Sequence, residues 1–118
     1  MAYNMSSMVD FYHYTSEASA GLIINSGMIK QSPNGGADAM LGTGVYGTAL
    51  TPAAGKRAIA SNNWAGGWQT RERGGHVDYV FKISIPRQSV LEFSGNRHIY
   101  LHKGPIYLGT YQWECYTF

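Results

Sequence analysis

The sequence has little cysteine, little charge and no long apolar run. Cys115 is the only cysteine among 118 residues, which excludes an intramolecular disulfide and a zinc site built from cysteine pairs. Charged residues make up 14% and the formal net charge is +2, a surplus too weak to indicate nucleic-acid binding by itself. No stretch approaches the roughly 20 apolar residues that a membrane span needs.

The first residues, MAYNMSSMVD, also lack the basic segment and apolar segment of a secretory signal. We therefore expect a soluble protein that is cytoplasmic or delivered by a route other than Sec. Hydrophobic residues make up 44%, enough to bury a core, and a chain of this length leaves little room for a second one. We expect one domain spanning residues 1–118.

The hydrophobic pattern predicts an α+β fold. Ser16 is placed to cap a helix from about Glu17 to Asn25 that ends at Gly27, and Thr51-Pro52 begins a second helix that ends near Asn62. Residues 65–76 are polar and glycine-rich and predict a loop. Strands are expected at residues 9–15, 28–30, 44–50, 77–85, 89–93, 98–102, 105–108 and 111–117.

The clearest strand pattern is VDYVFKISI, residues 77–85. Apolar and polar residues alternate along it, as in a strand with one face turned to the core. We expect it to be a central strand of a sheet. Its buried face should carry Val77, Tyr79, Phe81, Ile83 and Ile85.

Two short motifs could carry chemistry. Tyr12-His13-Tyr14-Thr15 ends the first strand and comes directly before the first helix. Gly42-Thr43-Gly44-Val45-Tyr46-Gly47-Thr48 surrounds the start of a later strand. Each alone has an ordinary explanation, because histidine is often a hydrogen-bonded core group and glycine is common in turns.

Taken together, in this order and spacing, the two motifs resemble the His-Tyr class of ADP-ribosyltransferases. The likeness is closest to the toxin-type subfamily with the HYD signature, including the Asp38-Ala39 pair before the second motif, and it covers about residues 11–60 well. A weaker likeness links the chain to rifampin ADP-ribosyltransferase. The resemblance implies an ADP-ribosyltransferase-like split β-sandwich with two short helices and with NAD in the cleft between its sheets.

The resemblance also implies roles for individual residues. The backbone of Tyr14 would hold the nicotinamide carboxamide, and His13 and Thr15 would bind ribose hydroxyls on the adenosine side. The ring of Tyr46 would pack on the nicotinamide, and Gly44 would let the chain approach the dinucleotide closely. NAD is therefore the expected co-substrate, and one ADP-ribose would pass to a protein, a nucleic acid, a small molecule or water.

Cleavage of the nicotinamide–ribose bond needs a carboxylate, because the transition state resembles an oxocarbenium ion. We rank Glu92 first, since its position after VDYVFKISI resembles that of the acid in rifampin ADP-ribosyltransferase. Glu114 is second, and Asp78 and Asp38 stay open. Poly(ADP-ribose) polymerases carry glutamate where this chain has His98, so elongation of a polymer is not expected.

Two further interpretations stay open beside an NAD-dependent mono-ADP-ribosyltransferase or NAD glycohydrolase. One is a module that binds NAD or ADP-ribose without catalysis. The other is a β-rich domain that binds a protein or nucleic acid through its tyrosines. We expect no metal, because His98 and His102, which are four residues apart, lie on one face of a predicted strand and not on a helix.

Overall fold

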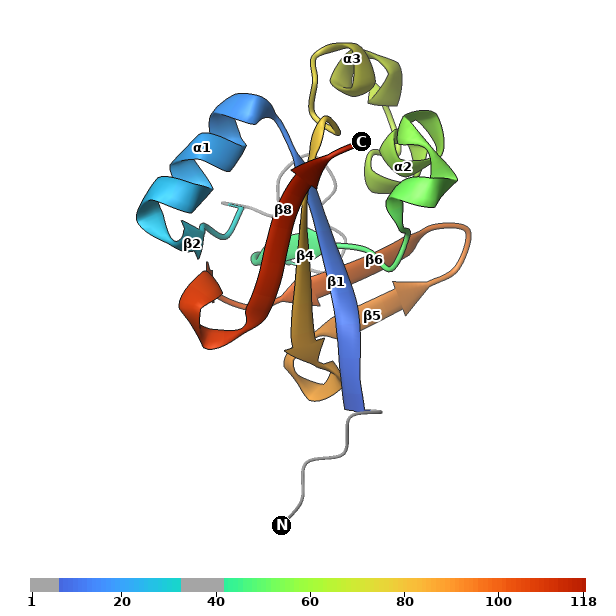
Figure 1. Cartoon of the computed structure of the whole chain (residues 1–118). Coiled ribbons are helices and arrows are strands. Elements are labelled where there is room, and N and C mark those ends of the chain that lie inside the picture. The colour runs from blue at the N-terminus through green and yellow to red at the C-terminus, as the bar shows by residue number, and fades with distance from the viewer. Residues whose placement is uncertain (1–6, 33–41) are drawn as a thin grey trace.

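The computed structural model describes residues 7–32 and 42–118, and Figure 1 shows the arrangement of their helices and strands. The described helices are α1 (Glu17–Ser26), α2 (Lys56–Asn63) and α3 (Trp68–Arg73). The described strands are β1 (Met8–Thr15), β2 (Met28–Ile29), β3 (Val45–Gly47), β4 (Tyr79–Pro86), β5 (Leu91–Ser94), β6 (His98–His102), β7 (Ile106–Tyr107) and β8 (Gln112–Thr117). The α+β class predicted from the sequence is confirmed.

The strands form two three-stranded antiparallel sheets, with strand orders β1-β4-β8 and β3-β6-β5, and a small β2-β7 pair. β4 is the central strand of the first sheet, as predicted. It begins at Tyr79, two residues later than expected. β1 runs along its whole length, from Met8 opposite Pro86 to Thr15 opposite Tyr79.

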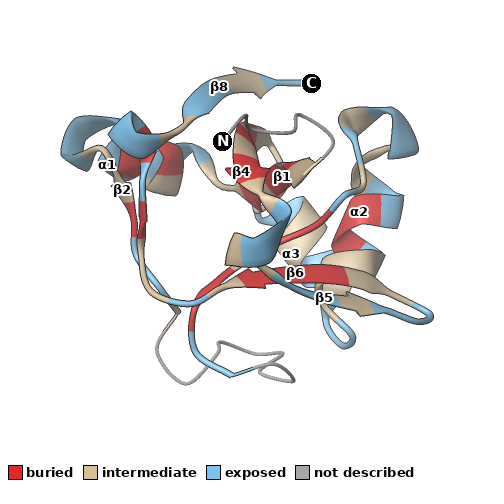
Figure 2. Ribbon diagram, turned by 90° about the horizontal axis from the view of Figure 1, so that it is seen from below, coloured by how far each residue is buried: buried red, intermediate tan, exposed pale blue. Residues whose placement is uncertain are grey.

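Two separate groups of apolar side chains bury one face of the first sheet and one end of its other face. Phe11, Phe81 and Ile83 belong to a core that also includes side chains from α1 and β7. Tyr12, Tyr14 and Val80, on the opposite face, pack with side chains of α2. Figure 2 shows the buried parts of β1 and β4 as one layer and that of β6 as another.

The predicted inward face of β4 is confirmed for Phe81, Ile83 and Ile85, which are fully buried in the first core, whereas Tyr79 is half-buried. Val77 is also fully buried, but it precedes β4 and packs in the second core with Val80, because α2 covers this end of the sheet. Alternation alone could not predict the second covering layer.

The first helix forms as its capping residues predict. The Ser16 hydroxyl accepts a hydrogen bond from the Ser19 amide at 3.3 Å, and Gly27 ends the helix with a φ of 72°, a conformation that favours glycine. Ile23 is buried, whereas the next residue, Ile24, is 52% exposed because the helix turns only one narrow face to the core.

Two expectations for residues 51–76 were wrong. Pro52–Ala54 forms a short 3₁₀ turn, and Gly55 with a φ of 90° separates it from α2, so the predicted second helix is in two pieces. The predicted loop contains α3, which gives three helices in the described residues in place of two. Gln, Arg and Glu in this segment favour helix, and Trp68 packs against the second core. The flanking glycines hid that signal.

Candidate active site

The two sheets meet where β1 passes the end of β3. Tyr12 and Thr48 exchange both backbone hydrogen bonds, from the Tyr12 amide at 2.9 Å and from the Thr48 amide at 3.0 Å. In an antiparallel ladder the amide and carbonyl of every second residue point to the same edge. The amide and carbonyl of Tyr14 therefore also point toward β3 and away from β4. If the ladder continued, Tyr46 would be the residue paired with Tyr14.

In place of that backbone pair, the side chain of His13 contacts the backbone of Tyr46. Its Nδ1 lies 2.8 Å from the carbonyl oxygen of Tyr46. A carbonyl only accepts, so the proton is assigned to Nδ1 and Nε2 keeps a lone pair. Burial lowers the pKa of His13 and so favours the neutral ring. The hydrogen bond to the Tyr46 carbonyl raises this pKa, but its effect is smaller.

The amide and carbonyl of Tyr14 thus lie on the edge of β1 that faces β3, beside the contact between the His13 ring and the Tyr46 carbonyl. We call this place the edge notch. It comprises the backbone of Tyr14, the backbone of Tyr46 and the ring of His13. A donor and an acceptor on one residue, beside a neutral imidazole, match the hydrogen-bonding groups of a primary carboxamide.

The side chains of the two tyrosines are held by other bonds. The hydroxyl of buried Tyr14 donates to the carbonyl of Leu50 at 2.7 Å, and burial raises the pKa of this phenol. The hydroxyl of Tyr46 donates to the carbonyl of Gly42. Tyr14 thus contributes its backbone to the edge notch, whereas its side chain supports the fold. Thr15 is half-buried at the end of β1, opposite Tyr79.

The glycines of the second motif have packing roles. A Cβ on Gly44 would lie 2.5 Å from the carbonyl oxygen of His102, and one on Gly47 would lie 2.5 Å from the ring of Phe11. At Gly44 the close approach that the sequence suggested is therefore an approach to β6. Gly42 has a φ of 100°, which side-chain-bearing residues rarely adopt.

Glu92 lies in β5, the exposed edge strand of the second sheet. It pairs with Tyr100, which pairs with Gly47, so its backbone is about two strand spacings, roughly 10 Å, from β3. Paired residues share a face, and the ring of Tyr100 stacks on Phe11 with centroids 6.0 Å apart. The side chain of Glu92 is therefore on the face turned to β1, whereas Tyr46 projects from the opposite face.

The carboxylate of Glu92 has one close partner. Its Oε2 lies 2.8 Å from Nε2 of His98, while Oε1 lies 3.8 Å from the guanidinium of Arg87. The amide of Ala49 donates to Nδ1 of His98 at 3.1 Å. Nδ1 therefore accepts, and the proton belongs on Nε2, directed at Glu92.

Polar side chains behind His98 fix its position, and sequence reasoning missed this group. The hydroxyl of fully buried Thr48 donates to the His98 carbonyl at 2.8 Å. Asn62, at the end of α2, brackets the same residue, donating to the carbonyl at 2.9 Å and accepting from the amide at 2.7 Å. Thr48 is the last residue of the second motif, so a signal was present. Asn62 was interpreted only as the end of a helix.

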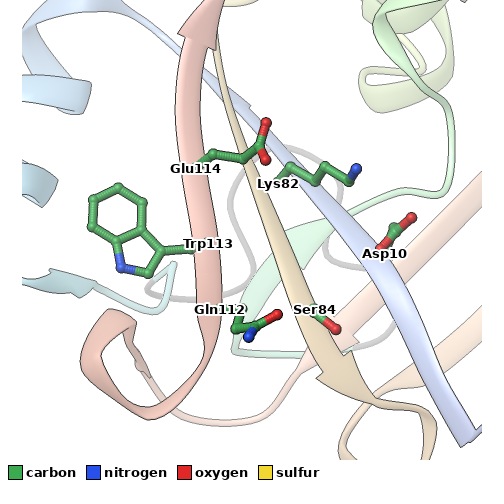
Figure 3. A pocket seen from close by; sticks show the side chains of 6 residues that line it. All are labelled: Asp10, Lys82, Ser84, Gln112, Trp113 and Glu114. Atoms are coloured by element: carbon green, nitrogen blue, oxygen red, sulfur yellow. The ribbon is translucent and has the colours of Figure 1, made fainter. Parts of the chain in front are cut away.

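The other candidate acids lie elsewhere. Glu114 is opposite Lys82, which is opposite Tyr12, so it lies on the face of the first sheet that His13 does not share. It lines a pocket of about 420 Å³. Figure 3 shows its side chain beside Lys82 in that pocket. Asp78 forms an ion pair of 2.9 Å with Lys56. The Asp38-Ala39 pair lies outside the described residues.

Neither a metal group nor a membrane helix is found in residues 7–32 and 42–118. There, no cluster of three or more His, Cys, Asp or Glu side chains is arranged to hold a metal ion. None of the helices there combines the length and apolar character required to cross a membrane.

The fold and the site together define a small α+β domain in which His13 on β1 contacts Tyr46 on β3 where the two sheets meet. A model of the family described as HYD1 signature containing ADP-ribosyltransferase matches residues 11–104. The match covers most of the chain, and the chain belongs to this family. The expected membership in the toxin-type HYD subfamily is thereby confirmed. No curated protein and no solved structure matches the chain.

Proposed function

We propose that this domain binds NAD at the edge notch and cleaves the bond between nicotinamide and ribose, passing one ADP-ribose to an acceptor or to water. The observation that carries the proposal is the free pairing edge of Tyr14 beside the His13–Tyr46 contact of 2.8 Å. The nicotinamide carboxamide needs one donor and one acceptor, and the Tyr14 amide and carbonyl supply both. Membership in an ADP-ribosyltransferase family supports the same assignment.

The neutral tautomer of His13 suits a ribose hydroxyl. Its Nε2 keeps a lone pair while Nδ1 is committed to the Tyr46 carbonyl, so the ring can accept a hydrogen bond from a sugar hydroxyl. Thr15, two residues further along β1, offers a second hydroxyl contact. The ring of Tyr46 would pack on the nicotinamide at the edge of β3, where the ligand would pass from the face of Tyr46 to the face of Glu92.

Glu92 is the proposed catalytic acid. When the nicotinamide bond breaks, positive charge develops on the ribose, and a nearby carboxylate stabilises it more in the transition state than in the ground state. Glu92 projects toward β1 from the second sheet, and its carboxylate is 39% exposed, so a ligand can reach it. Glu114 faces the other side of the first sheet, which favours Glu92 over it.

The test is release of free nicotinamide from NAD. We expect wild-type protein to release it and Glu92→Gln to lose about 100-fold or more in rate, because the amide keeps the size of the side chain but not its charge. Thermal stabilisation by NAD should persist in this variant. Glu114→Gln and Asp78→Asn are matched controls and should retain wild-type turnover.

A second candidate is a domain that binds NAD without cleaving it. The observation that favours it is that Oε2 of Glu92 is already bonded to His98. In that case NAD would raise the melting temperature while wild-type protein released no nicotinamide. Loss of turnover in Glu114→Gln alone would instead move the acid to Glu114.

A further inference from the structure

The ring of His98 links Ala49, two residues after the end of β3, to Glu92 in β5. On one side Nδ1 accepts from the Ala49 amide at 3.1 Å, and on the other Nε2 lies 2.8 Å from Oε2 of Glu92. The ring plane is also fixed, since it meets the Tyr100 ring edge-on with centroids 4.6 Å apart. The imidazole therefore has one orientation and one tautomer.

The backbone of His98 does not need this ring for its own position. Its carbonyl accepts from Thr48 at 2.8 Å and from Asn62 at 2.9 Å, and its amide donates to Asn62 at 2.7 Å. β6 is thus held at this residue by contacts that a substitution of the side chain leaves intact. We therefore assign to the ring the contact with the Glu92 carboxylate.

That contact restricts an otherwise loosely held acid. Glu92 lies on an exposed edge strand, and its other partner, Arg87, is 3.8 Å away and has a side chain that is 58% exposed. A glutamate in such a place would sample several rotamers. The bond from His98 fixes Oε2 and leaves Oε1 available to a ligand.

We infer that His98 is a positioning residue that holds the Glu92 carboxylate toward the ribose of bound NAD, through a relay from the Ala49 amide. This inference rests on the proposed function, since it gives the relay a purpose only if Glu92 acts on NAD. No bond is made or broken at His98, and its proton stays on Nε2. Its effect is to keep the acid in one geometry before the reaction begins.

Two substitutions at this position separate the halves of the relay. In His98→Asn the side-chain oxygen can replace Nδ1 as acceptor for Ala49, but the side chain is too short to reach Glu92. In His98→Gln the longer side chain brings an amide donor to the place of Nε2 and no longer serves Ala49 at the Nδ1 position. The measurements are nicotinamide release as kcat and KM for NAD, thermal unfolding, and stabilisation by NAD.

We expect His98→Asn to lose about 10- to 100-fold in kcat with little change in KM, because an acid that is displaced by about 1 Å loses much of its effect. His98→Gln, which restores a donor to Glu92 but not the bond from Ala49, should recover part of that loss. The double variant Glu92→Gln/His98→Asn should be no slower than Glu92→Gln alone, since both changes remove the same contribution.

The inference is overturned if His98→Asn retains wild-type kcat while Glu92→Gln is inactive. It is also overturned if His98→Gln is as slow as a folded His98→Asn. Where His98→Asn fails to fold, an inactive but folded His98→Gln has the same meaning. A wild-type protein that releases no nicotinamide would remove the proposed function itself, and the inference with it.

Discussion

The two three-stranded sheets are stabilised by different interactions. β1, β4 and β8 have eight, eight and six residues, and their central strand has apolar side chains packed on both faces. β3, β6 and β5 have three, five and four residues, and three of the four residues of β5 are exposed. There, side-chain hydrogen bonds from Thr48 and Asn62 to β6 take over part of the role of apolar packing.

This difference bears on the place of Glu92. It lies on the exposed edge strand of the short second sheet, near the polar cross-links, whereas Asp10 and Glu114 lie on the uncovered part of one face of the first sheet. The first sheet supplies a rigid strand, β1, whose edge faces the second. The candidate site lies between β1 and the second sheet with its polar cross-links.

The largest expected effect is at the centre of the first sheet. Phe81→Ala removes a fully buried ring from β4 and should lower the free energy of unfolding by about 3–5 kcal/mol. Leu91→Ala in β5 is the matched change in the second sheet. Its side chain is 47% exposed, so we expect a loss below about 1 kcal/mol. Equal losses in urea unfolding would erase the contrast between the sheets.

Thr48→Val tests the polar cross-links of the second sheet. Valine has nearly the same shape, but it cannot donate to the His98 carbonyl or accept from the Leu50 amide at 3.2 Å. We expect a loss of about 1–3 kcal/mol in the free energy of unfolding. Thr117→Val, at an exposed position of β8, serves as control and should change stability by less than about 0.5 kcal/mol.

The junction of the two sheets should respond to pH through His13. Its pKa is lowered in the folded protein, so below the ordinary value of 6.5 the unfolded chain binds a proton that the folded one resists. Stability should therefore fall as the pH drops below about 6.5, with a contribution of at most about 1.4 kcal/mol per pH unit from this group.

His13→Asn isolates this contribution. The asparagine amide can still donate to the Tyr46 carbonyl but does not titrate, and the other histidines are common to both proteins. The difference between the two unfolding curves from pH 8 to pH 5 should have the slope described. Parallel curves would show that another group controls the pH dependence.

The smallest effect is expected at the ion pair between Lys56 and Asp78. The side chains are 35% and 47% exposed, and Lys56 also lies 5.3 Å from the centre of the Phe118 ring. Lys56→Met should cost less than about 1 kcal/mol, and added salt should reduce the cost further. Lys30→Met, on an exposed residue, gives the baseline. A loss above about 2 kcal/mol would make this contact as important as the buried ones.

Local signals in the sequence predicted local structure well. Ser16 and Gly27 delimit α1 by capping, and the alternation in VDYVFKISI identified the central strand. The family resemblance placed His13 and Tyr46 at one site, and the His13 ring contacts the Tyr46 carbonyl, while the roles of both residues toward NAD stay predictions. What failed was α3, because two glycine-rich flanks outweighed the helix-forming residues between them.

The site beyond those motifs could not be predicted from the sequence. The relay from Ala49 through His98 to Glu92 joins residues 49 and 6 positions apart, and it depends on the register of β5 against β6. The free edge of Tyr14 depends on a single bridge to Thr48, which no periodicity reveals. Alternation along a strand predicts on which face of the sheet a residue lies, but not which residues of other strands lie beside it.

That bridge has a mechanical consequence. One pair of hydrogen bonds between Tyr12 and Thr48 resists sliding of the two strands but hardly resists rotation about the axis through it, so it acts as a pivot. The His13 ring, one residue further on, is then a spacer whose width sets how far β3 stands from β1. Any side chain at Gly47 would meet the Phe11 ring at the same point and wedge the strands apart. The separation of β1 and β3 beside the edge notch therefore also depends on Gly47 and Phe11, which are not part of the notch.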